Sequence, residues 1–198
     1  SRLLDATDTL LQQALQQTSE RLELPPQPAH LTRLFAVPSM EHRFTAERMM
    51  PVAGALLGTM GLHLSRLPGL QVLRDPMPGP RPSRAFPIHL PREVRLVVHP
   101  APGLGWAQQH LLALGRAIHW LHGEPGPFPC RWPLGHRAVS DGFGLLLASV
   151  LTHPGALMDR GLPWDAAEAL GRAAQNQRLL HLRTLAALLT GTPCGPDA

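Results

Sequence analysis

Leucines recur at helical spacing near the start of the chain. Across residues 3–23 the apolar positions fall on one stripe, with glutamines and charged residues elsewhere, and a period of about 3.6 residues is typical of an amphipathic α-helix. Pro25 and Pro26 follow, so the helix is expected to end before them. The stripe consists of Leu4, Leu11, Leu15, Thr18 and Leu22. The sequence therefore predicts an N-terminal helix within residues 1–24.

A second helical pattern covers residues 40–64. Pro51 within it indicates a bend or the start of a new helix. Three glycines weaken the pattern, because each costs about 1 kcal/mol relative to alanine inside a helix. The recurring apolar face holds Met49, Val52, Leu56, Met60 and Leu64.

Two short strands are expected after a proline-rich stretch. Residues 75–84, DPMPGPRPSR, do not suit regular structure, whereas RAFPIHL (84–90) and EVRLVVH (93–99) have the composition of strands. Pro91 and Arg92 between them predict a hairpin. The second run alternates in a way that fits one buried face, formed by Val94, Leu96 and Val98.

Three helices follow in the remaining sequence, at about 106–122, 137–151 and 165–189. The first has an apolar core face and a second stripe at i, i+4 and i+7. The last is rich in leucine and is expected in the core; the alternative is that its apolar face forms a homodimer or partner surface. Residues 191–198 are expected to be a flexible tail. We predict one mainly α-helical domain over residues 1–198, with a small β-hairpin or sheet.

Composition narrows the class of protein further. With 44% hydrophobic and 16% charged residues over 198 positions, the chain can bury a core. Its positive charge comes from scattered arginines, with no lysine and no tyrosine, so we expect no nucleic-acid partner. Cys130 and Cys194 do not make a disulfide framework, and no segment suits a membrane span or a signal peptide. A cytoplasmic protein without a membrane partner is expected.

The segment QHLLALGRAIHWLH, residues 109–122, carries the most specific motif. Zinc peptidases use the frame H-E-x-G-H-A-x-H, in which two histidines one turn apart bind zinc and the glutamate activates water. Gly115, Ala117 and His119 keep their places in this frame. The two ligand positions and the base position between them hold Leu112, Arg116 and Ala113.

Taken with its flanks, this segment resembles the thimet-oligopeptidase and oligoendopeptidase family of zinc metallopeptidases. The likeness spans residues 30–190 and includes the hairpin before the helix and the run VSDGFG after it. The family has a glutamate as third zinc ligand; the matching position is Asp141, 25 residues after Arg116. The resemblance implies a zincin-like catalytic core, with the small sheet beside the site helix.

The resemblance also implies that the chemistry is lost. Leu112 cannot bind metal, Ala113 cannot act as a base, and Arg116 repels a cation, so nothing activates a water molecule. The family also uses tyrosine and histidine groups nearer the C-terminus, and this chain contains no tyrosine. The chain is identified as a degenerate, shortened member of this family: a pseudoenzyme without zinc or another cofactor, which binds a peptide or protein.

Arg116 and Asp141 are expected to form an ion pair. A lone buried carboxylate is costly, and a guanidinium near the zinc position of the active relatives would hydrogen-bond it. If the pair is buried, Arg116→Ala is expected to destabilise the fold by about 3–5 kcal/mol.

Alternative functions stay open from the sequence. A relocated metal site would use His119, His122, His136 and Asp141 and would give a working metal-dependent oligopeptidase. A regulatory or structural subunit would instead pair with an intact homologue.

Smaller features have competing interpretations as well. One interpretation of Cys130 is a nucleophile with His136 as its base. The favoured interpretation is a structural thiol in a loop. We interpret Gly142 and Gly144 as remnants of the family pattern rather than as a close helix contact. The expected peptide-binding strand, by strand addition as in active relatives, is Glu93, Val94, Arg95, Leu96, Val97, Val98 and His99.

Overall fold

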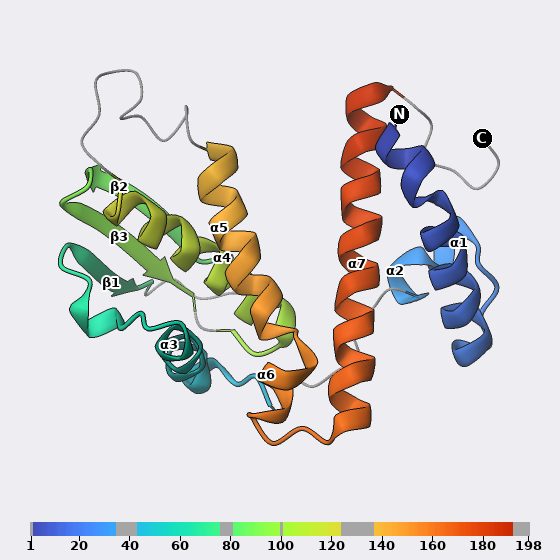
Figure 1. The fold of residues 1–198 in the computed structure, drawn as a ribbon, viewed down its shortest axis with the longest axis horizontal. Coiled ribbons are helices and arrows are strands. Elements are labelled where there is room, and N and C mark those ends of the chain that lie inside the picture. Colours follow the sequence, from blue (N-terminus) through green and yellow to red (C-terminus); the bar gives the residue numbers. More distant parts are fainter. Residues whose placement is uncertain (1, 35–42, 76–80, 100, 124–136, 192–198) are drawn as a thin grey trace. The chain divides into compact units, whose positions relative to one another are not determined.

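The fold comes from a computed structural model that describes residues 2–34, 43–75, 81–99, 101–123 and 137–191. It is mainly helical with one small sheet, as predicted (Figure 1). The chain forms two compact units, where the sequence analysis expects a single domain. One comprises Ser1–Pro38 with Gly161–Ala198, and the other Ser39–Arg160. Each unit is described by itself.

The first unit, the terminal unit, is built on two long helices, α1 (Arg2–Leu22) and α7 (Trp164–Thr190). They run antiparallel, since Arg183, late in α7, contacts Leu4 and Asp8 at the start of α1. The short α2 (Leu31–Leu34), after a 3-10 turn at Pro28–His30, packs against α1. The core centres on Ala14, Leu15 and Leu34, with Leu11, Leu24, Leu31 and Leu180 around it.

The predicted bounds of α1 and α7 are close to those observed, because both segments have a long apolar period. Of the predicted α1 stripe, Leu15 and Thr18 are buried, whereas Leu22 at the last turn is exposed. α7 ends at Gly191, whose φ of 65° suits the left-handed cap that glycine adopts without strain.

The second unit, the central unit, contains α3 (Met49–Thr59), three strands, α4 (Leu104–Leu121), α5 (Arg137–Leu151) and α6 (Pro154–Met158). The predicted 40–64 helix is shorter than expected. Its regular part stops at Thr59, and Gly61 follows with a φ of 75°, a left-handed conformation that cannot continue a right-handed helix. Short 3-10 turns flank it at Ala46–Arg48 and Leu64–Arg66.

The sheet has the order β1-β3-β2. β2 (Arg84–His89) and β3 (Glu93–Val98) pair antiparallel, which confirms the predicted hairpin. β1 (Leu70–Arg74), which was not predicted, pairs parallel with the other side of β3. α4 packs on β2 and β3, and α5 packs on α4. The buried β3 face is the predicted one, Val94, Leu96 and Val98.

None of the helices within the described ranges has the length and apolar character needed to cross a bilayer.

Candidate functional site

The positions that the sequence analysis compares with a zinc-peptidase motif, Leu112, Ala113, Arg116 and Asp141, lie where α4 crosses α5. Arg116 Nε donates a hydrogen bond to Asp141 Oδ1 at 2.6 Å, and each side chain is 31% exposed. The predicted ion pair is therefore confirmed, but it is only partly buried. Because water screens a pair that is about one-third exposed, the predicted cost of 3–5 kcal/mol for Arg116→Ala falls to about 1 kcal/mol.

Glycines bring the two helices into backbone contact beside this pair. A Cβ added to Gly115 would lie 2.6 Å from Gly144 Cα, and one added to Gly144 would lie 2.8 Å from Leu112 Cδ1. Gly144 thus does allow close helix approach, and the interpretation of it as a mere remnant of the pattern is wrong. Gly142 has open space around it. Of the three glycines, only Gly115 and Gly144 lie where an added Cβ would meet the other helix.

His119 belongs to the same contact. Its Nδ1 hydrogen-bonds Ser140 Oγ at 2.8 Å, and Ser140 is fully buried. The His119 ring also lies 5.3 Å from the Phe143 ring, centroid to centroid, at a tilt of 33°. His119 is therefore a packing and hydrogen-bonding residue between α4 and α5.

The donor set at this crossing does not fit zinc. Leu112 has no donor atom, Ala113 is buried and has none either, and the Arg116 guanidinium is a permanent cation. Metal chemistry at these positions is therefore not available from the residues present.

The relocated metal set does not assemble among the described residues. His122 Nδ1 hydrogen-bonds the Ile118 carbonyl at 2.9 Å, and His119 is bonded to Ser140. Within the described ranges, no three His, Cys, Asp or Glu side chains come together in a group that could hold a metal. His136 and Cys130, with Cys194, lie outside these ranges.

A buried polar cluster that the sequence analysis missed lies between the sheet and α4. His99 Nε2 is 2.6 Å from Asp75 Oδ2, the His99 backbone N–H donates to Ser83 Oγ at 3.4 Å, and His110 Nδ1 lies 3.4 Å from the same Ser83 Oγ. The aspartate and the serine contact different imidazoles. A Ser-His-Asp relay needs one imidazole to bridge both, so this cluster is not arranged as a catalytic triad.

His110 is the buried end of this cluster. Its side chain is fully buried, and Nε2 has no hydrogen-bond partner in the described part of the chain. Burial lowers the pKa of His110 to about 4, because an apolar surrounding disfavours the charged imidazolium. The ring is therefore neutral at physiological pH and contributes to packing.

The expected peptide-binding strand, residues 93–99, forms β3 in the centre of the sheet. Both of its hydrogen-bonding edges are occupied, one by β1 and one by β2. Strand addition needs an unpaired edge, so this prediction is wrong. In the part of the chain that the structure describes, the sheet edges belong to β1 and β2.

Comparison with protein-family models, with curated proteins and with solved structures finds no match for this chain.

Proposed function

We propose that this protein is a non-catalytic, peptidase-like domain in which an ion pair takes the place of a metal bridge. The proposal rests on the 2.6 Å hydrogen bond between Arg116 Nε and Asp141 Oδ1. In support, the three positions to which the resemblance assigns zinc ligands, Leu112, Arg116 and Asp141, all lie at one helix crossing. The pair joins α4 to α5, as a shared metal would.

The residues at this crossing support a structural role. A guanidinium stays protonated and cannot activate water, and Ala113 offers no base at the position between the former ligands. Paired charges avoid the desolvation cost of a lone carboxylate. The crossing therefore holds two helices together and leaves the surrounding surface free for binding.

The binding role that we propose is capture of an extended peptide by β1. All five β1 residues pair in continuous register with β3, and no strand of the described ranges pairs with the opposite edge of β1. β2 is a poorer edge, because it contains Pro87 and a register irregularity between Pro87 and His89. Val72 and Leu73 on β1 are 44% and 43% exposed and would contact the peptide.

Cleavage and metal assays test the loss of catalysis. Purified protein is expected to hold no stoichiometric zinc and to leave a quenched-fluorescent peptide library intact. Cleavage that a chelator abolishes would overturn the proposal and would favour the relocated-metal alternative with His119, His122, His136 and Asp141.

A peptide-binding assay tests the role of β1. The wild-type protein is expected to retain a subset of extended apolar peptides from an immobilised hexapeptide library, and Leu73→Glu is expected to lose them. Ile88→Glu on β2, also at an exposed apolar position, is the matched control and should still bind. Equal loss in both variants, or retention in both, would contradict the assignment to β1.

A further inference from the structure

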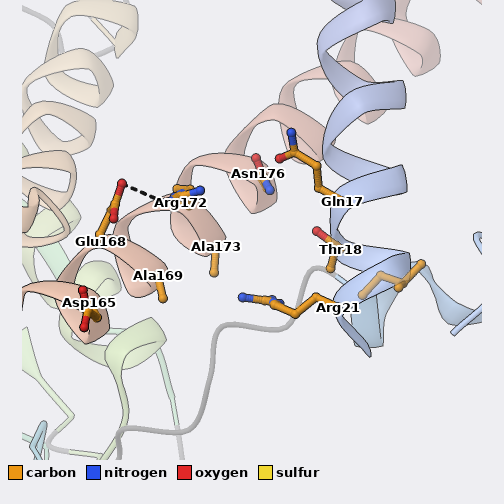
Figure 2. A pocket seen from close by; sticks show the side chains of 10 residues that line it. Gln17, Thr18, Arg21, Asp165, Glu168, Ala169, Arg172, Ala173 and Asn176 are labelled. Atoms are coloured by element: carbon orange, nitrogen blue, oxygen red, sulfur yellow. Dashed lines mark ion pairs between the residues drawn. The ribbon is translucent and has the colours of Figure 1, made fainter. Parts of the chain in front are cut away.

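The terminal unit contains a groove between α1 and α7 that the proposed function does not use. Its volume is about 350 Å³, within the range of small-molecule sites. Its walls come from α1, α2 and α7, and Figure 2 shows side chains of α1 and α7 extending into the space between the helices. The lining residues that matter for ligand chemistry are Thr18, Arg21, Leu34, Asp165, Ala169 and Ala173.

One part of the groove lining is apolar, and a threonine lies beside it. Leu34 and Ala173 are buried. Thr18 is only 6% exposed, but its Oγ1 is not one of the described buried polar atoms that lack a hydrogen-bond partner. Because Thr18 lines the groove, its hydroxyl is placed to exchange a hydrogen bond with a bound molecule.

Two arginines and two carboxylates line the groove, but only one arginine and one carboxylate form an ion pair with each other among the described residues. Glu168 and Arg172 satisfy each other, with Oε1 and Nη2 2.7 Å apart. Arg21 on α1 and Asp165 on α7 line the same groove and form no ion pair among the described residues. The groove thus presents one unpaired cation on one wall and one unpaired anion on the other.

We propose that this groove binds a small zwitterion, an α-amino acid or a short peptide with an apolar side chain. Arg21 would pair with the carboxylate, with the Thr18 hydroxyl as a further donor, and Asp165 would pair with the ammonium. The apolar side chain would rest on Leu34, Ala169 and Ala173. Two carboxylates in the lining balance the two arginines, which disfavours a dianion such as phosphate.

Calorimetric titration of the full chain tests this ligand class. The probes are L-leucine and the dipeptide Leu-Leu, with 4-methylpentanoate and 3-methylbutylamine as analogues that each lack one charge. At least one zwitterion is expected to bind tenfold more tightly than either analogue, and inorganic phosphate is expected not to compete. Tighter binding of leucine would identify the ligand as a free amino acid, and tighter binding of Leu-Leu would identify it as a short peptide. Equal binding of zwitterion and analogue, or no binding of either zwitterion, would overturn the proposal.

Variants locate the site on the groove. Arg21→Gln and Asp165→Asn are each expected to weaken zwitterion binding by tenfold or more, while Arg2→Gln, exposed on the same helix and outside the groove, leaves it unchanged. If Arg21→Gln fails to fold, Arg21→Lys keeps the charge but loses the forked geometry, and a threefold or larger weakening is then expected. Unchanged affinity in a folded Arg21 variant contradicts the assignment. None of these readouts depends on the α4–α5 crossing.

Discussion

Two helix pairs in this protein solve the same packing problem in opposite ways. α4 and α5 touch through Gly115 and Gly144 and pair their charges across the contact. α1 and α7 are joined at one end by Arg183, and at the other end they leave a groove lined by long polar side chains. Small residues at a crossing let backbones meet and exclude ligand, whereas long side chains keep helices apart and leave room for one.

The largest loss of stability is expected from a substitution that separates α4 from α5. Gly144→Ala places a methyl group against the backbone of Leu112 and is expected to destabilise the central unit by about 3 kcal/mol. Gly142→Ala, two residues earlier in the same helix with nothing near its Cβ, is expected to stabilise by up to about 1 kcal/mol. Urea denaturation measures both. Equal effects of the two substitutions would refute the backbone contact.

Acid should weaken the central unit through His110. The pKa of His110 is about 4 in the folded chain against an ordinary value of 6.5. Between these two pH values the unfolded chain binds the proton and the folded chain does not, so the free energy of unfolding falls as pH falls. The free energy of unfolding is unaffected by His110 above about pH 6.5. It falls by about 3 kcal/mol between pH 6.5 and 4 and levels off below about pH 4.

Matched variants isolate the contribution of this histidine. His110→Leu, which removes the titrating ring, is expected to flatten the dependence of unfolding free energy on pH between 6.5 and 4. His89→Gln, at an 80% exposed side chain, is expected to keep it. Superimposable pH profiles of His110→Leu and the wild type would show that the cluster does not sense acid.

Loss of the Arg183 contact should loosen α1 from α7. Its Nη1 donates to the Leu4 carbonyl at 2.6 Å and to Thr7 Oγ1 at 2.8 Å, and its Nη2 pairs with Asp8 Oδ1 at 2.9 Å, while the side chain is 13% exposed. Arg183→Ala is expected to cost about 2 kcal/mol in thermal or urea unfolding. Asp8→Asn, at a 58% exposed carboxylate, should cost only about 0.5 kcal/mol. A larger effect at Asp8 would contradict this ranking.

The smallest expected difference is between the coupling free energies of two ion pairs. A double-mutant cycle on Arg116 and Asp141 is expected to give a coupling free energy of about 1 kcal/mol, because both side chains are partly buried. The same cycle on Glu168 and Arg172, an i, i+4 pair on α7 with 40% and 65% exposure, should give about 0.4 kcal/mol. Coupling that is equal in both cycles would show that the crossing does not strengthen its pair.

Periodicity and spacing predicted much of this structure. α4, α5 and α7 have long apolar periods, and their observed bounds differ little from the expected ones. The hairpin was predictable from two short apolar runs separated by a turn. The pairing of Arg116 with Asp141 was predictable because the resemblance drawn from the sequence assigns both positions to one site.

Pairings between distant segments were not predictable in the same way. β1 has five residues, four of them exposed, and so has no alternating pattern to reveal it. Without β1, the central place of β3 and the loss of its edges could not be foreseen. The polar cluster joins three residues that flank strands and one residue in α4, and no local motif connects them: Asp75, Ser83, His99 and His110.

Metal analysis of a restored motif tests the central claim most directly. The variant with Leu112→His, Ala113→Glu, Arg116→His and Asp141→Glu recreates the ligand set and base of the frame. We predict that mass spectrometry finds about one zinc per folded chain of this four-residue variant. The wild-type protein, and a three-residue variant that has the other substitutions but keeps Arg116, are expected to hold no stoichiometric zinc. A four-residue variant that folds, as judged by circular dichroism, and still binds no zinc would contradict the account of Arg116 and Asp141 as replacements for a metal bridge.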